Sequence, residues 1–147
     1  MDDATIYELK KGWMGKMTYN ALNQYKQNAV FTATPEELTL MLYDGGIKFM
    51  NIAKYSIENN DVQRAHEALI RAQDIIIELN SSLNMEYEIS TNFRRLYGFI
   101  LDKLIDANIQ KNMEPIDEAL DILIEMRDTW KEAMQQVKKK VYQNRQV

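Results

Sequence analysis

The chain of 147 residues contains no cysteine, which excludes disulfides, thiolate nucleophiles and zinc–thiolate sites. Glycine (5) and proline (2) are scarce, so the turns of a sandwich or barrel and a glycine-rich nucleotide loop are not expected. No apolar run is long enough to cross a bilayer, and the acidic start is not followed by the apolar core of a signal peptide. We therefore expect one helical domain in the cytoplasm, without membrane insertion.

Groups that perform chemistry are also few. The single histidine, His66, has Gln63 three residues before it, so the Glu-x-x-His pair of di-iron bundles is absent, and the carboxylates are scattered among Lys and Arg at helical spacing. The net charge of -4 argues against nucleic-acid binding. We interpret the basic cluster of Lys138 to Lys140 with Arg145 as the solvated end of a helix rather than a membrane or RNA patch. We predict no catalytic residue, metal or cofactor, and hence no enzyme.

Capping residues place the helices. Thr34, Pro35 and Glu37 form a helix start with a capping box, and this first helix is expected to reach about Asn59. Asp61 then caps a second helix, a third follows a break after Asn84 and ends within 108–112, and a fourth begins near residue 112.

The last three predicted helices each carry one apolar seam, and in the second and fourth helices its spacings of three and four alternate, the pattern of helices that cross at shallow angles. Short connections make successive helices antiparallel. The predicted fold is therefore all-α, an antiparallel up-down-up-down four-helix bundle with an N-terminal arm. The seams are Val62, Ala65, Leu69, Ala72, Ile76, Leu79 and Leu83; Ile89, Phe93, Leu96, Ile100, Leu104 and Ala107; and Ile116, Ala119, Leu123, Met126, Trp130, Ala133 and Val137.

Several apolar residues lie off these seams. We predict that five of them widen the core, namely Ile70, Ile77, Tyr97, Leu101 and Ile105. Gly45 and Gly46 interrupt the first helical pattern, where small residues permit close packing of a neighbour. The first helix also carries two apolar stripes, which suggests that one of them faces another molecule. One stripe is Leu38, Met41, Leu42, Gly45, Phe49 and Ile52, and the other is Leu40, Tyr43, Ile47 and Met50.

The segment 32–46, TATPEELTLMLYDGG, closely resembles the opening of the flagellar secretion chaperone FliS family. Tyr25-Lys26-Gln27-Asn28, Ala72-Gln73-Asp74-Ile75-Ile76 and Arg127-Asp128-Thr129-Trp130 support the resemblance in the same order. It covers about residues 18–143 and includes an arm at 18–33. Residues 1–17 form an extension outside it, and residues 144–147 a tail.

The resemblance implies a chaperone that holds the C-terminal segment of flagellin, prevents premature polymerisation and assists delivery to the flagellar export apparatus. In the family the segment before the first helix lies over the guest-binding surface, so Leu22 and Tyr25 are the first partner-binding candidates. Leu40, Tyr43, Ile47 and Met50 are the second set, although burial by another helix of the bundle is an equal alternative for each.

Two other functions stay open at this point. A histidine-phosphotransfer domain is also a four-helix bundle. The pattern of such domains has a lysine and a glycine after the histidine, whereas this chain has Ile70 and Arg71 after His66. A plain surface role for His66 is favoured. A generic helical adaptor is the other alternative, and the sequence leaves open whether arm exchange produces a homodimer.

Overall fold

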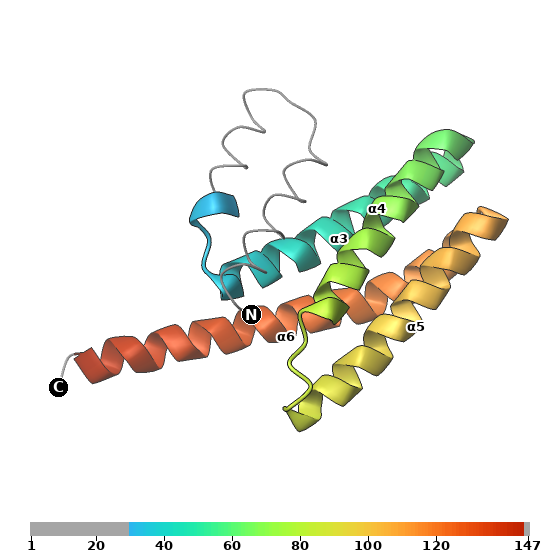
Figure 1. Cartoon of the computed structure of the whole chain (residues 1–147). Helices are drawn as coiled ribbons and strands as arrows, with labels where there is room; N and C mark the ends of the chain where they lie inside the picture. The colour runs from blue at the N-terminus through green and yellow to red at the C-terminus, as the bar shows by residue number, and fades with distance from the viewer. Residues whose placement is uncertain (1–29, 146–147) are drawn as a thin grey trace. The chain divides into compact units, whose positions relative to one another are not determined.

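The computed structural model describes residues 30–145, and its regular elements there are the helices α3 (Pro35–Glu58), α4 (Val62–Ser81), α5 (Glu88–Gln110) and α6 (Met113–Arg145) (Figure 1). No strand occurs within this range. The chain divides into two compact units, 1–39 and 40–147, and the two are treated separately below. The predicted all-helical fold is confirmed, and the predicted arm lies largely outside the described residues.

The described part of the first unit contains the predicted start of α3. The backbone N–H of Glu37 donates to Thr34 Oγ1 at 3.2 Å, as in the first half of a capping box. Just before this cap, Val30 to Thr32 are helical, within the stretch that the sequence assigns to the N-terminal arm. The amide of Ala33 donates to the Val30 carbonyl and closes that turn. The cap at Thr34 therefore separates two helical segments.

The connections in the second unit also follow local chemistry. Asp61 caps α4, because its Oδ1 accepts from the Arg64 amide at 3.1 Å. In the connection between α4 and α5, the Asn84 side chain accepts from the Glu86 amide and its carbonyl accepts from Ser90 Oγ at 2.6 Å. The helix α5 ends before Lys111, which has the left-handed φ of 51°. The predicted breaks are confirmed, although α4 ends at Ser81, before the predicted Leu83 and Asn84.

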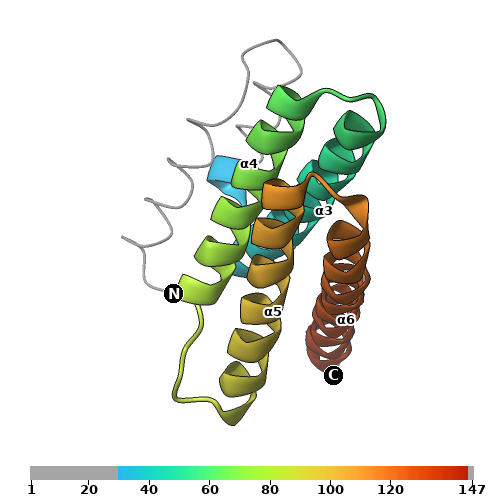
Figure 2. The same cartoon turned by 90° about the vertical axis from the view of Figure 1, so that its right-hand side faces the viewer.

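Contacts between helices establish the direction of packing. Asp44 pairs with Arg127 at 3.1 Å and Lys54 pairs with Asp117 at 2.5 Å. The later residue of α3 thus pairs with the earlier residue of α6, so the two helices are antiparallel. The guanidinium of Arg71 lies 5.6 Å from the centre of the Phe49 ring, which joins α4 to α3. Figures 1 and 2 show α4 beside α5 and α5 beside α6, each pair antiparallel. This is the predicted up-down-up-down order.

The core of the second unit is the apolar interior of this bundle. Each helix contributes a row spaced by three and four residues, which is the spacing that places side chains on one side of a helix. The buried rows include Leu42, Met50 and Ala53 of α3; Leu69, Ala72, Ile76 and Leu79 of α4; Tyr97, Ile100, Leu104 and Ala107 of α5; and Ile116, Ala119, Leu123 and Met126 of α6.

Burial ends before the predicted seams do. Val62 and Ile89, in the first turns of α4 and α5, are exposed, as is Val137 in the last part of α6. The prediction of a widened core is confirmed for Tyr97, which is buried, and Leu101 is half-buried. It is wrong for Ile70, Ile77 and Ile105, which are exposed. These three residues lie on the flank of their helices, beyond the arc that the neighbouring helices cover.

The two stripes of α3 belong to one wide buried arc. Tyr43 and Met50 are buried, while Leu40 and Ile47 are half-buried at its edge. The ion pairs of Asp44 and Lys54 place α6 beside this edge. Enclosure within the bundle, the alternative that the sequence left open, therefore accounts for Tyr43 and Met50, because a helix in a four-helix ring is flanked by two neighbours.

None of the helices within residues 30–145 combines the length and the apolar content needed to cross a membrane, in agreement with the interrupted apolar pattern of each.

Gly46 and Gly98 allow a stability test with contrasting surroundings. A Cβ at Gly46 would lie 3.0 Å from Leu123 Cδ2 and 3.5 Å from Ile75 Cγ2, whereas nothing lies within 4 Å of one at Gly98. We expect Gly46→Val to lower the free energy of unfolding by about 1–3 kcal/mol through overpacking. Gly98→Ala should raise it by about 0.5–1 kcal/mol, since alanine favours the helix. Urea unfolding followed by circular dichroism measures both, and an unchanged midpoint for Gly46→Val would contradict the close approach.

Candidate functional site

An exposed aliphatic row runs over α4 and α5. We call Ile70, Ile77, Leu101 and Ile105 the aliphatic face. The exposed fractions are 39% for Ile70, 47% for Ile77 and 40% for Ile105, and Leu101 is half-buried. Lone exposed apolar residues are ordinary, but a row shared by two packed helices is the kind of surface that binds another apolar group.

Register brings these residues together. The Nδ1 atom of His66 lies 3.0–3.2 Å from the side-chain amide of Asn108, which joins α4 to α5. Because the helices are antiparallel, the residue four positions after His66 on α4 lies level with the residue four positions before Asn108 on α5. Ile70 therefore lies level with Leu104, next to Ile105. By the same count Ile77 lies level with Tyr97, next to Gly98.

Gly98 adds space to the aliphatic face. It is exposed, and no atom outside its own helix lies within 4 Å of where its Cβ would be. A glycine in the middle of a helix weakens that helix without a packing benefit from inside the bundle. A guest side chain, or the backbone of a guest helix, could approach α5 closely here.

A buried hydrogen bond supports the aliphatic face from below. The Tyr43 and Tyr97 hydroxyls are 2.6 Å apart and join α3 to α5 inside the bundle. Burial raises the pKa of both phenols above the ordinary value of 10.0. Both are therefore neutral at physiological pH, and each supplies the other's hydrogen-bond partner. This pair holds Tyr97 inside the core, and Tyr97 immediately precedes Gly98 in α5.

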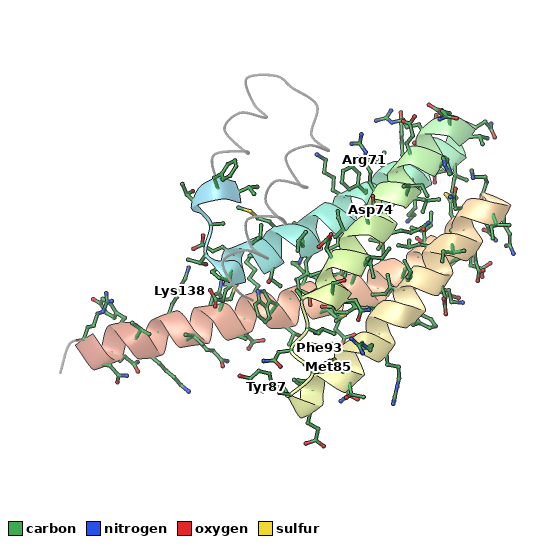
Figure 3. All side chains as sticks on the ribbon, viewed as in Figure 1. Arg71, Asp74, Met85, Tyr87, Phe93 and Lys138 are labelled. Atoms are coloured by element: carbon green, nitrogen blue, oxygen red, sulfur yellow. The ribbon has the colours of Figure 1, made fainter. Side chains whose placement is uncertain are left out.

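The connection at the lower end of α4 and α5 exposes further apolar groups. Met85 and Tyr87 lie in this connection and are exposed, and Phe93 follows in the second turn of α5 (Figure 3). The ring of Phe93 lies 6.5 Å from that of Tyr97, centre to centre. Phe93 therefore lies one helical turn before Tyr97, toward the loop end of α5.

The predicted partner-binding residues fall into three groups. Leu22 and Tyr25 lie outside the described residues. Tyr43 and Met50 are buried, the alternative that the sequence left open, and Leu40 and Ile47 are half-buried beside α6. Their binding roles stay predictions.

Sequence reasoning named Ile70, Ile77 and Ile105 but assigned them to the core. A signal for their exposure was present, because Ile70 and Ile77 are seven residues apart and lie outside the complete seam of α4. Met85 and Tyr87 were missed altogether. They stand in a polar connection, where helical spacing gives no information about burial.

The described residues contain little that could perform chemistry. Within residues 30–145 no group of three His, Asp or Glu side chains is placed to hold a metal ion. His66 is on the exposed side of α4 and faces Asn108. The arrangement is suited to holding an apolar guest.

Comparison with known proteins gives consistent matches. The family model described as "Flagellar protein FliS" matches residues 18–137. The flagellar secretion chaperone FliS of Bacillus subtilis (strain 168) is 43% identical over 120 residues, covering 82% of this chain and 90% of the relative. That of Salmonella typhimurium is 33% identical over 109 residues, covering 72% and 81%. A solved structure described as a flagellar chaperone from bacteria has a TM-score of 0.66 at 21% identity, and it covers 79% of this chain and 96% of its own; this likeness supports the fold.

The buried tyrosine pair makes stability depend on alkaline pH. Both folded-state pKa values are raised, so this contribution is fully present below the ordinary pKa of 10.0 and is lost as the pH rises above it. We expect the urea midpoint to fall between about pH 9 and about pH 11, and to fall less in the double variant Tyr43→Phe/Tyr97→Phe. Tyr43→Phe alone should cost about 1–2 kcal/mol at neutral pH, because it removes the partner of a buried hydroxyl. An equal alkaline loss in the double variant would contradict this role.

Proposed function

The chain belongs to the FliS family of flagellar secretion chaperones, and we propose that it binds the C-terminal segment of flagellin in the cytoplasm. By holding this segment it prevents premature polymerisation and assists delivery of flagellin to the flagellar export apparatus. Its role is binding without catalysis, metal or cofactor. The observation that supports the proposal most directly is the aliphatic face of α4 and α5, an apolar row on the outside of a complete bundle.

The chemistry of the aliphatic face suits a helical guest. An amphipathic segment that is disordered when free can fold on an apolar surface, and its side chains at three- and four-residue spacing can contact such a row. Ile70 and Ile77 are seven residues apart on α4, which is two helical turns. A guest helix lying along α4 would thus present residues of two turns to the two isoleucines.

The ordering of the guest makes binding reversible. Part of the interaction free energy is spent on folding the segment, so affinity is lower than the same contact area would give a rigid partner. Reversible binding is what delivery to an export apparatus requires, because the chaperone must release its guest there. The exposure of Ile70, Ile77 and Ile105 also means that the surface is available without opening the core.

Leu22 and Tyr25 complete the proposal. We place them in an arm, at residues 18–33, that shields apolar surface in the empty chaperone and moves or joins the interface when flagellin binds. An apolar surface without such cover tends to associate nonspecifically. Leu40 and Ile47, half-buried on α3, are secondary candidates for contact with the arm or the guest.

The aliphatic face can be tested with matched isoleucine variants. We expect Ile77→Ser and Ile105→Ser each to weaken flagellin binding by about ten-fold, because each removes an apolar contact at the proposed interface. Isothermal titration calorimetry with monomeric flagellin measures the affinity. The control is Ile89→Ser, since Ile89 is 57% exposed but lies on the opposite side of α5 from Ile105.

Flagellin lacking its C-terminal segment should not bind any of these proteins. Full affinity for that truncated flagellin would contradict the proposed guest segment. Loss of affinity in Ile89→Ser equal to that in Ile77→Ser would contradict the location of the site while leaving the function intact.

The arm is tested separately by Tyr25→Ala. We expect a change in flagellin affinity of about three- to ten-fold with a urea midpoint close to that of the parent chain, because an arm residue belongs to no core seam. Stopped-flow mixing with fluorescent flagellin measures association and dissociation rates. If both rates and the affinity remain those of the parent chain, Tyr25 has no part in binding.

A further inference from the structure

The helix α6 extends beyond the bundle. Lys103 of α5 pairs with Glu118 of α6 at 2.6 Å. Because the two helices are antiparallel, the residue fifteen positions before Lys103, Glu88, lies level with the residue fifteen positions after Glu118, Ala133. Since α5 begins at Glu88, the rest of α6 has no part of α5 beside it. Figure 1 shows this segment continuing past α4 and α5, and Figure 3 shows Lys138 on it. Residues 135–145 are all exposed.

An apolar seam continues along this segment. Trp130, Met134, Val137 and Val141 are separated by four, three and four residues, the spacing of a coiled-coil seam. Trp130 and Met134 are half-buried, while Val137 is 60% and Val141 45% exposed. Valines on a solvated helix end add nothing to helix propensity, because β-branching lowers it. This row shares Trp130 and Val137 with the predicted seam of the bundle but turns to Met134 and Val141, and it extends past the level of the first residue of α5.

Basic residues flank this seam on both sides. In the heptad that places Met134 and Val141 at position a and Val137 at d, Lys138 and Arg145 occupy e and Lys140 occupies g. Lys139 falls at f, on the opposite side of the helix. Within this heptad frame the e and g positions from Lys138 onward are all basic and no acidic residue occurs among residues 133–145.

We propose that residues 130–145 of α6 are a docking helix for an acidic amphipathic helix of another protein, paired as a short coiled coil. Charges at e and g decide partner choice in coiled coils, so a seam flanked by lysine and arginine selects glutamate or aspartate on the partner. A second copy of this chain would place these basic residues against their own kind. A membrane surface would call for a broader apolar face than this narrow row of two valines and a methionine.

This inference does not rest on flagellin binding. The docking helix lies on α6, past the end of α5, whereas the aliphatic face is built from α4 and α5. Loss of one function should therefore leave the other in place, and the two proposals can fail independently.

The test uses a designed acidic peptide as the probe. It has three heptads with Leu and Val at a and d and glutamate at e and g, and carries a fluorophore for anisotropy titration against the full chain. We expect saturable binding that weakens with added salt, because solvent-exposed charge pairs are screened. The matched peptide with lysine at e and g should not bind, and vesicles of anionic phospholipid should not compete.

Charge-reversal variants locate the site. Lys138→Glu/Lys140→Glu should weaken binding of the acidic peptide by about ten-fold or more and should create binding of the basic peptide. Lys139→Glu reverses one charge on the opposite side of the helix and should leave the affinity within about two-fold. All three residues are exposed, so circular dichroism and the urea midpoint should remain those of the parent chain.

Several results would overturn the proposal. These are absence of binding to the acidic peptide, equal loss in Lys139→Glu, or failure of the reversed variant to prefer the basic peptide. Sedimentation that shows a dimer dispersed by Val141→Asp would assign the seam to a second copy instead. Binding to anionic vesicles that the acidic peptide does not displace would assign it to a membrane.

Discussion

The bundle depends on close approach between α3 and its neighbours at Gly46. A methyl group there would meet Leu123 of α6 and Ile75 of α4, so the glycine allows two helices to lie against α3 at the same level. Close approach is what allows α3 to bury a broad arc of its surface rather than a narrow seam. The ion pairs of Asp44 and Lys54 with α6 lie at the edge of that arc and are exposed to solvent, so their net contribution is small.

The same constraint determines where apolar surface remains free. Helices in a four-membered ring cover each other on the inside and on two flanks, and their outer sides face solvent. The isoleucines at 70, 77 and 105 lie just beyond the covered flanks of α4 and α5 and are therefore exposed. The hydrogen bond between Tyr43 and Tyr97 holds α5 from the inside, so this outer surface is presented by a rigid element. A surface that is already rigid loses little conformational entropy when a guest binds, so the chaperone's own contribution to the unfavourable ordering term is small.

Local signals were the most predictable part of this chain. The caps at Thr34 and Asp61 and the break at Asn84 were read correctly, because each depends on a side chain that bonds to its own backbone within a few residues. The middle of each seam was also predicted, since spacings of three and four put residues on one side of a helix whatever surrounds it. The ends of the seams were not, because Val62, Ile89 and Val137 have the right spacing but no neighbouring helix beside them.

The sequence by itself thus determined the helices, their antiparallel order, the family and the scarcity of groups for catalysis, because all of these depend on local bonding, spacing and composition. Only the tertiary structure decided which apolar residues are covered. In it Tyr43 and Met50 are buried and Ile70 and Ile77 are exposed. The helix α6 also extends past the level of Glu88, the first residue of α5. The physical reason is that burial depends on the distance and register of other helices, and residues far apart in the chain set both.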